Sequence, residues 1–191
     1  MLAILEAIDN QQIQNIDKVL VISNRSDSVG LQIAKTNNRV STEIIPKRKL
    51  TNIEFDNILT ETLKSYDVCP TNGLICLAGF MQILGPEIVN MYQNRIMNIH
   101  PSLLPSFKGL HAQKQAVDAG VKVSGCTVHF VDNYVDHGPI ILQKCVPVFD
   151  RDDESLLSDR ILIEEHKIYT EAINLFVNNM LKIKDNKVFI N

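Results

Sequence analysis

Three short runs of the sequence are apolar at consecutive rather than alternate positions, which restricts the kind of sheet that the chain can form. They occupy residues 19–23 (VLVIS), 74–79 (LICLAG) and 95–100 (RIMNIH). A strand that is apolar on both faces is typical of the interior of a parallel sheet, where helices cover both sides. Because segments with helical spacing lie between these runs, the sequence predicts an α/β fold with a doubly wound, mostly parallel open sheet.

The remaining segments complete this alternation. Further helices are expected at residues 28–37 and 52–66, a further strand at residues 42–45, and two hairpin strands at residues 121–131 and 139–149. The loop DNYVDHG joins the two hairpin strands. A last helix is expected from residue 154 to about residue 180, because apolar residues share one face and acidic residues crowd its start.

The composition indicates one domain that acts on small molecules. A chain of 191 residues with 45% apolar content can bury a substantial core, and no linker or repeat divides residues 1–191. The formal net charge is −3, with acidic and basic residues mixed along the chain. The sequence therefore predicts neither nucleic-acid binding nor attraction to an anionic membrane.

The cysteines and the opening segment predict a cytoplasmic protein. Cys69, Cys76, Cys126 and Cys145 form no C-x-x-C pair and lie in or beside apolar stretches, so reduced, buried thiols are expected. The opening segment MLAILEAIDN has only a short apolar run with two acids, and no apolar stretch has the length of a membrane span.

The stretch NIHPSLLPSFKGLHA, residues 98–112, places an amide and an imidazole two residues apart at the end of an expected strand. Side chains two apart on a strand share one face, so Asn98 and His100 should project together while Ile99 faces away. This pair suits acyl transfer, in which an oxyanion is stabilised while a proton leaves an attacking amine. The alternative is that both residues only fix the following loop through backbone hydrogen bonds.

A third candidate is Asp136, in the loop between the two hairpin strands. A carboxylate beside His100 would favour the charged imidazolium and orient the ring. Read alone, Asp136 followed by Gly138 and Pro139 is ordinary turn chemistry. The spacing of the chain leaves both interpretations open.

Metal and dinucleotide sites find no support in the sequence. The five histidines form no H-E-x-x-H or H-x-x-x-H arrangement, so no metal site is expected. His129 lies inside an apolar strand, where a hydrogen-bonded structural role is expected. The glycines never form G-x-G, which excludes the usual dinucleotide and P-loop fingerprints in this sequence.

Four segments in this order resemble the phosphoribosylglycinamide formyltransferases, or GAR transformylases, a family of folate-dependent formyltransferases. They are LAGFMQIL (residues 77–84), NIHPSLLPSFKGLHA, HFVDNYVDHGPIILQ (residues 129–143) and EEHKIY (residues 164–169). The resemblance begins with a helix at residues 2–8 and covers nearly the whole chain. It implies a Rossmann-like fold and formyl transfer from 10-formyltetrahydrofolate to the amino group of glycinamide ribonucleotide, in purine biosynthesis.

The resemblance also implies roles for individual residues. Asn98 and His100 match the catalytic amide and histidine of the family, and Asp136 matches the acid that raises the pKa of that histidine and relays protons. Pro101 and Glu165 match positions that contact the nucleotide substrate. The positions that match folate contacts are Met81, Gln82, Ile83, Leu84, Asn98, Val131 and Asp136.

This sequence departs from the family at its beginning. Family members carry a first strand and a glycine-rich loop that cradles the substrate phosphate, and Met1 aligns just after that loop. The fold is therefore expected to lack that strand and loop, through a late start at an internal methionine or through real shortening. The late start is favoured, because deleting a central strand exposes its neighbours. Gln82 stands where arginine is common in the family.

Other functions remain open. Formyltetrahydrofolate deformylases share the Asn, His and Asp and remain an alternative, although they carry an additional domain that does not fit this chain. Methionyl-tRNA formyltransferases add a tRNA-binding domain, which does not fit this mildly acidic chain either. A non-catalytic folate-binding or scaffold protein is the alternative if the missing beginning is real. A homodimer is also compatible with the resemblance.

Overall fold

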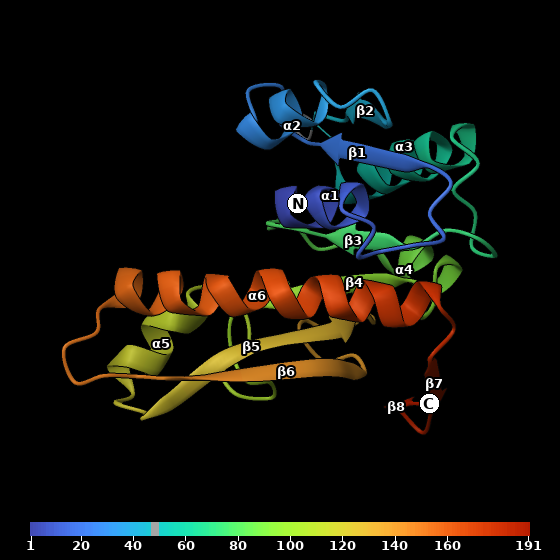
Figure 1. Cartoon of the computed structure of the whole chain (residues 1–191). Helices are drawn as coiled ribbons and strands as arrows, with labels where there is room; N and C mark the ends of the chain where they lie inside the picture. Colours follow the sequence, from blue (N-terminus) through green and yellow to red (C-terminus); the bar gives the residue numbers. More distant parts are fainter. Residues whose placement is uncertain (47–49) are drawn as a thin grey trace.

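Helices and strands alternate through most of the computed structural model, which describes residues 1–46 and 50–191 (Figure 1). The helices are α1 (Leu2–Asp9), α2 (Val29–Ala34), α3 (Asn52–Ser65), α4 (Pro86–Met91), α5 (Ala112–Asp118) and α6 (Glu154–Val177). The strands are β1 (Val19–Ser23), β2 (Val40–Ile44), β3 (Ile75–Leu77), β4 (Ile96–His100), β5 (Val123–Phe130), β6 (Ile140–Pro147), β7 (Leu181–Lys184) and β8 (Lys187–Ile190).

The strands form three hydrogen-bonded groups. β1 and β2 pair in parallel, and β3 pairs in parallel with β4. The strands β4, β5 and β6 are successive antiparallel neighbours, and β7 pairs with β8. Within the described residues, no backbone hydrogen bond joins β1 to β3. The parallel pairs followed by an antiparallel hairpin confirm the predicted α/β fold class.

Strand β4 lies between two hydrophobic cores. Ile96 is fully buried in a core formed mainly by α3 and α4, and Met97 is fully buried in a core shared by β5, β6 and α6. Successive side chains of a strand point to opposite faces, so neighbouring residues enter different cores. This explains why the run at residues 95–100 lacks strict alternation, and it leaves Asn98 and His100 at the carboxyl end of the strand.

Helix α6 covers the four-stranded sheet and begins with a capped turn. The Asp153 carboxylate accepts a hydrogen bond from the amide of Leu156 at 2.8 Å, which satisfies a donor at the start of the helix. Further along, the hydroxyl of the buried Tyr169 lies 2.9 Å from the carbonyl oxygen of Leu77 and 3.0 Å from that of Met97. The helix is thereby fixed to the ends of β3 and β4.

The structure corrects several predictions. Helix α6 ends at Val177 rather than at residue 180, because Asn179 adopts a left-handed conformation with φ +56°. The short helices α4 and α5 and the strands β7 and β8 were not predicted, since each has at most seven residues and too little pattern to detect. Cys145 is exposed, so the prediction of buried thiols is wrong for this residue.

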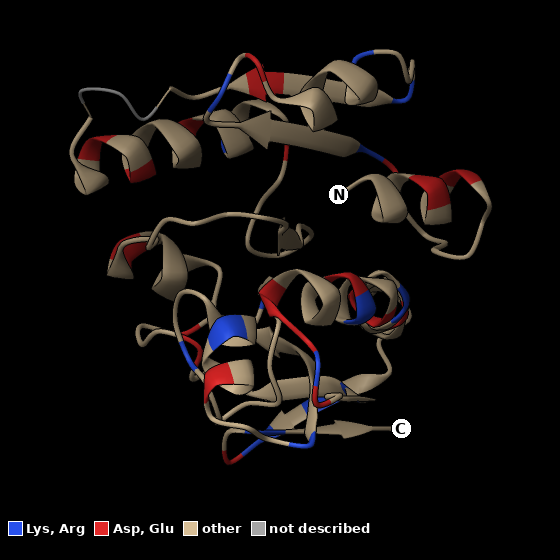
Figure 2. Cartoon of the chain, turned by 90° about the vertical axis from the view of Figure 1, so that its left-hand side faces the viewer, with Lys and Arg blue, Asp and Glu red and all other residues tan. Residues whose placement is uncertain are grey.

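Charged residues are interspersed over the surface rather than gathered by sign (Figure 2). Red and blue segments occur in both the upper and the lower part of the ribbon, in agreement with the small net charge of −3. Among the described residues, no helix combines the length and the hydropathy that a membrane crossing requires.

We predict that Asp152 stabilises the start of α6 in a pH-dependent manner. Hydrogen bonds from Arg160 and from the amide of Phe149 lower the pKa of Asp152 from 3.8 to about 2. Because the pKa falls on folding, the stabilisation is complete above pH 3.8 and is lost as the pH falls toward 2. Thermal unfolding should show a lower melting temperature for Asp152→Asn at neutral pH and a shrinking difference in acid.

The control for this experiment is Asp150→Asn. Asp150 pairs with Lys122 through side chains that are 85% and 73% exposed, and such exposed pairs contribute little to stability. A change in melting temperature as large as that of Asp152→Asn would contradict the special role of Asp152.

Candidate functional site

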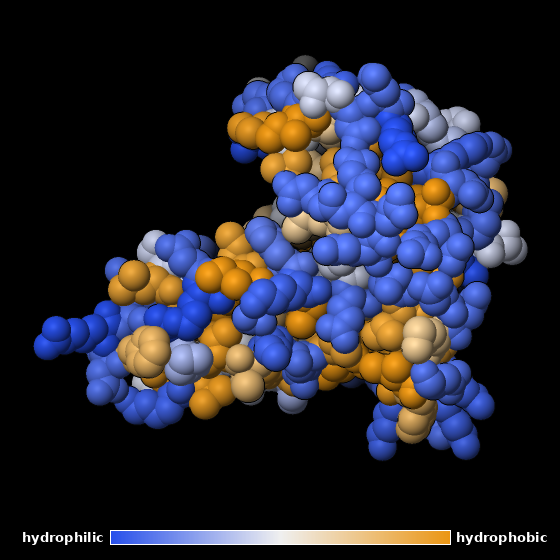
Figure 3. All heavy atoms as spheres, viewed as in Figure 1, coloured by the Kyte–Doolittle hydropathy of each residue, from blue (hydrophilic) through white to orange (hydrophobic). Residues whose placement is uncertain are grey.

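The pairing of β4 with β5 brings the polar residues of two strands together. Asn98 lies opposite His129, and His100 lies opposite Thr127. The molecule is hollowed on the side of α5 and the start of α6 (Figure 3), and β1 points toward this side (Figure 1). The loop after β4 leads to α5 on the same side. The candidate site therefore lies at the carboxyl ends of the parallel strands, where ligands of such sheets bind.

His100 is buried, and both of its ring nitrogens face oxygen atoms. Nε2 lies 2.8 Å from the carbonyl oxygen of Phe107, and Nδ1 lies 3.3 Å from Oδ2 of Asp136. A carbonyl oxygen can only accept, so Nε2 carries a proton. A proton on Nδ1 as well would make the ring a cation at ion-pair distance from the Asp136 carboxylate.

Asp136 is held against His100 by the backbone of another loop. Its Oδ2 accepts a hydrogen bond from the amide of Gly109 at 2.8 Å, and its side chain is 11% exposed. Its Oδ1 lies 3.7 Å from Nε2 of His129. The residues alone left the contact between Asp136 and His100 open and the family resemblance implied it, and the structure brings the two side chains to 3.3 Å.

His129 completes the cluster and orients the amide of Asn98. Its Nδ1 donates to the carbonyl oxygen of Phe130 at 2.8 Å, so Nε2 of the neutral ring is an acceptor. The atom of Asn98 that faces Nε2, at 3.4 Å, is accordingly the amide nitrogen. Burial lowers the pKa of His129 and outweighs the Phe130 carbonyl and Asp136, which both raise it. The lowered pKa favours the neutral ring near neutral pH, so Nε2 stays available as an acceptor.

The loop after β4 is anchored from β5 and β6. The hydroxyl of the buried Thr127 donates to the carbonyl of Ser102 at 2.7 Å and accepts from the amide of Leu104 at 3.0 Å. The side chain of Gln143 on β6 donates to the Leu104 carbonyl at 2.9 Å. These contacts fix the loop that supplies both Phe107 and Gly109 to the cluster.

The predicted folate-contact segment lies before α4. Met81 and Ile83 are 79% and 69% exposed, as expected of residues that could line a binding surface for a flat heterocycle. Oε1 of Gln82 is buried and has no hydrogen-bond partner among the described residues. The side chain of Leu84 is buried in the core beside α3 and α4, so a ligand contact at this position would come from its backbone.

The remaining predicted residues surround the cluster without joining it. Pro101 directly follows His100 at the end of β4, and Val131 follows β5 with its amide bonded to the carbonyl of Ile96 at 2.8 Å. Glu165 lies on α6, where burial raises its pKa and the positive charge of the Met1 amino group opposes that rise. Within the described residues, no hydrogen bond or ion pair joins Glu165 to the cluster.

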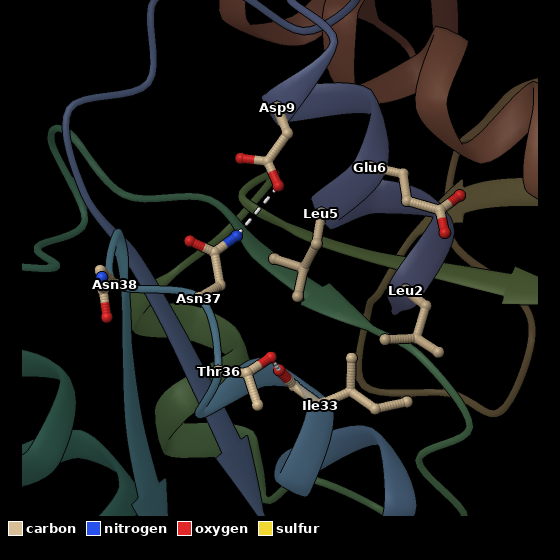
Figure 4. A pocket seen from close by; sticks show the side chains of 8 residues that line it. All are labelled: Leu2, Leu5, Glu6, Asp9, Ile33, Thr36, Asn37 and Asn38. Atoms are coloured by element: carbon tan, nitrogen blue, oxygen red, sulfur yellow. Dashed lines mark hydrogen bonds between the residues drawn. The ribbon is translucent and has the colours of Figure 1, made fainter.

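A second hollow lies between α1 and α2 and shares no residue with the cluster (Figure 4). Leu2 and Leu5 face Ile33 across it, and Asp9 accepts a hydrogen bond from Asn37 at 3.0 Å. Its lining contains no histidine. Among the described residues, no group of three or more His, Cys, Asp or Glu side chains could hold a metal ion.

Sequence reasoning found Asn98, His100 and Asp136 but gave His129 only a structural role. His129 is hydrogen-bonded and buried as expected, yet it also contacts the candidate amide. The signal that could have found it is strand pairing, because an antiparallel neighbour places a residue directly opposite Asn98. The exact register of two strands is not readable from their apolar pattern alone.

Comparisons with known proteins agree on the family. A family model described as formyl transferase matches residues 1–173. The phosphoribosylglycinamide formyltransferase of Escherichia coli is 36% identical to this chain, over 98% of the chain and 86% of that protein. The trifunctional purine biosynthetic protein adenosine-3 of Drosophila melanogaster is 46% identical over 89% of the chain, but the chain spans only 12% of that protein's length.

Solved structures show the same relationship. The glycinamide ribonucleotide transformylase 1 of Symbiobacterium toebii superposes with a TM-score of 0.92 and 45% identity, over 98% of this chain and 86% of that one. A formyltetrahydrofolate deformylase of Pseudomonas syringae superposes with a TM-score of 0.87 at 26% identity, and the chain covers 60% of it. Sequence, fold and site geometry lead to one conclusion: this chain belongs to the formyl transferase family.

Proposed function

We propose that this chain transfers the formyl group of 10-formyltetrahydrofolate to the amino group of glycinamide ribonucleotide, a step of purine biosynthesis. The observation that carries the proposal is the buried cluster in which His100 lies between Asp136 and the Phe107 carbonyl, beside an oriented Asn98. The names of its relatives from Escherichia coli and Symbiobacterium toebii support the same reaction. Because these substrates are metabolites of the cell interior, we also infer that the protein works in the cytoplasm.

The cluster supplies what formyl transfer requires. The substrate amine attacks the formyl carbon, a carbon–nitrogen bond forms, and the carbonyl oxygen becomes an oxyanion. Asn98 donates one amide proton to that oxygen while its other proton is held by His129. His100 donates a second hydrogen bond to the oxyanion, and the Asp136 carboxylate stabilises its charge. This requires the His100 ring to exchange the Phe107 carbonyl for the substrate oxygen.

The same cluster can transfer the proton that the reaction moves from one nitrogen to the other. The attacking nitrogen loses a proton, and the folate nitrogen gains one as its bond to the formyl carbon breaks. Asp136 and His100 lie 3.3 Å apart and can carry this proton between the two nitrogens, directly or through water. No net charge is left in the buried cluster once tetrahydrofolate leaves.

The surroundings of the cluster offer distinct surfaces for the two substrates. The exposed side chains of Met81 and Ile83 suit a flat heterocycle that brings apolar faces. Pro101 and Glu165 are our proposed contacts for the nucleotide. A glutamate suits the hydroxyl groups of a ribose because its oxygens accept hydrogen bonds.

A deformylase is the second candidate, because water could replace the amine as the nucleophile. The Pseudomonas syringae deformylase shares the fold, but its 26% identity is below the 45% of the Symbiobacterium toebii transformylase. A non-catalytic folate-binding protein is the third, and it predicts binding without turnover.

We predict that the purified chain consumes 10-formyltetrahydrofolate only when glycinamide ribonucleotide is present. The readout is the absorbance of the folate product, with formylated nucleotide identified by mass spectrometry. Consumption without the nucleotide would establish a deformylase. Binding of the folate without its consumption would indicate a non-catalytic folate-binding protein.

We predict that His100→Ala and Asn98→Ala each lower kcat by about 10² to 10³, the usual cost of losing one donor to an oxyanion. Neither variant should raise the KM for either substrate to a similar degree, because both groups act mainly in the transition state. The control is Asp118→Asn, which removes an exposed ion pair with Lys114 on α5. A kcat that stays near the wild-type value in either alanine variant would exclude the proposed role of that residue.

We predict that His129→Leu lowers kcat about tenfold by releasing the amide of Asn98, since small misplacements of catalytic groups are costly. His129→Gln retains an oxygen acceptor and should lose less activity. In the Asn98→Ala background, His129→Leu should have no further effect on kcat. An equal loss in both backgrounds would show that His129 does not act through Asn98.

A further inference from the structure

The loop that carries Asp136 is closed by a contact of its own. Nδ1 of His137 lies 2.7 Å from Oδ2 of Asp132, and Oδ1 of Asp132 accepts a hydrogen bond from the amide of Tyr134 at 3.0 Å. The rings of Tyr134 and His137 meet edge to face, with centroids 5.3 Å apart. We call the pair of Asp132 and His137, which spans the tip of the loop, the loop clamp.

Asp136 lies inside the segment that the loop clamp closes, and its backbone is strained. Its φ is +47°, in the left-handed region that side chains other than glycine seldom adopt. Such a conformation persists only where the surrounding contacts determine it. The preceding and following residues of the loop must therefore be held for Asp136 to keep its direction.

Close backbone packing fixes the base of the loop, so the conformation of the tip depends on side-chain contacts. A Cβ atom at Gly138 would lie 2.0 Å from the carbonyl oxygen of Phe130, so only glycine fits there. The amide of Phe130 donates to the Pro139 carbonyl at 2.9 Å. At the tip, Asn133 donates to the side chain of Asn90 at 3.0 Å, but that contact lies three residues before Asp136.

We propose that the loop clamp positions the carboxylate of Asp136 against Gly109 and His100. Within the described residues, no hydrogen bond or ion pair joins Asp132 or His137 to Gly109 or His100, so the pair acts through the backbone on either side of Asp136. The effect of the loop clamp on catalysis rests on the proposed formyl transfer, whereas its effect on the position of Asp136 does not. Nothing in the clamp touches the reacting atoms, so both members are positioning residues.

The exposure of Asp132 and His137 makes it possible to distinguish their positioning role from an effect on the stability of the whole fold. The side chain of His137 is 50% exposed and that of Asp132 is 29% exposed. Ion pairs with this much exposure contribute little to global unfolding. Removing the loop clamp should therefore loosen the loop while the melting temperature stays close to that of the wild type.

Hydrogen exchange at the amide of Gly109 tests the proposal directly, because that amide donates to Asp136 at 2.8 Å. His137→Ala and Asp132→Ala should each raise the exchange rate of Gly109 about tenfold, the effect of a modest local opening. His137→Asn retains a donor at the position of Nδ1 and should restore slow exchange. Asp136→Ala gives the rate expected when the acceptor is absent.

The matched control is Asp67→Asn. Asp67 is also left-handed, with φ +58°, and pairs through an exposed contact with Lys18. This variant should leave Gly109 unchanged. An unchanged Gly109 rate in His137→Ala, or an equal rise at Val128 in the core of β5, would overturn the proposal.

Kinetics then distinguishes this proposal from the proposed function. In an active wild-type protein, His137→Ala should lower kcat about tenfold with little change in either KM, and should add nothing in the Asp136→Asn background. A loss of equal size in both backgrounds would contradict positioning through Asp136. A wild-type protein without transfer activity would overturn the proposed function, and the exchange of Gly109 would still decide the role of the clamp.

Discussion

The burial of β4 on both faces is the constraint on which the rest of the structure depends. Ile96 and Met97 enter two different cores, so the strand cannot shift without exposing one of them. The fixed register places Asn98 opposite His129 and His100 opposite Thr127. Because apolar packing sets this register, the polar cluster inherits its geometry from side chains that take no part in its chemistry.

Two buried histidines in one cluster are tuned to different tasks by their hydrogen bonds. His100 has the carbonyl oxygen of Phe107 at Nε2 and the carboxylate of Asp136 at Nδ1. His129 faces a carbonyl at Nδ1 and an amide donor at Nε2, which suits the neutral ring, and burial lowers its pKa in the same sense. Asp136 lies 3.3 Å from His100 and 3.7 Å from His129, so its negative charge acts more strongly on the His100 ring.

The sequence predicts the strand that bears Asn98 and His100, and their shared face, because both follow from the period of two along a strand. It also predicts the hairpin of β5 and β6. That Asp136 reaches His100 was implied only by the family resemblance, because that contact depends on two loops, and the Gly109 amide that holds the carboxylate comes from the second of them. The exposed thiol of Cys145 shows the same limit, since local pattern does not specify which neighbour covers a residue.

The candidate site combines buried polar residues, which suit the chemistry, with exposed apolar side chains, which suit ligand binding. His100, His129 and Thr127 are almost completely buried, whereas Met81, Ile83 and Tyr134 are at least two-thirds exposed beside them. Water reaches these exposed apolar side chains until a ligand covers them. A flat, partly apolar donor that covers them would also exclude water from the oxyanion formed at Asn98, and exclusion of water strengthens each hydrogen bond to that oxygen. In the proposed reaction, donor binding would thereby contribute to the chemical step, and the one rearrangement left to the cluster is that His100 exchanges the Phe107 carbonyl for the substrate oxygen.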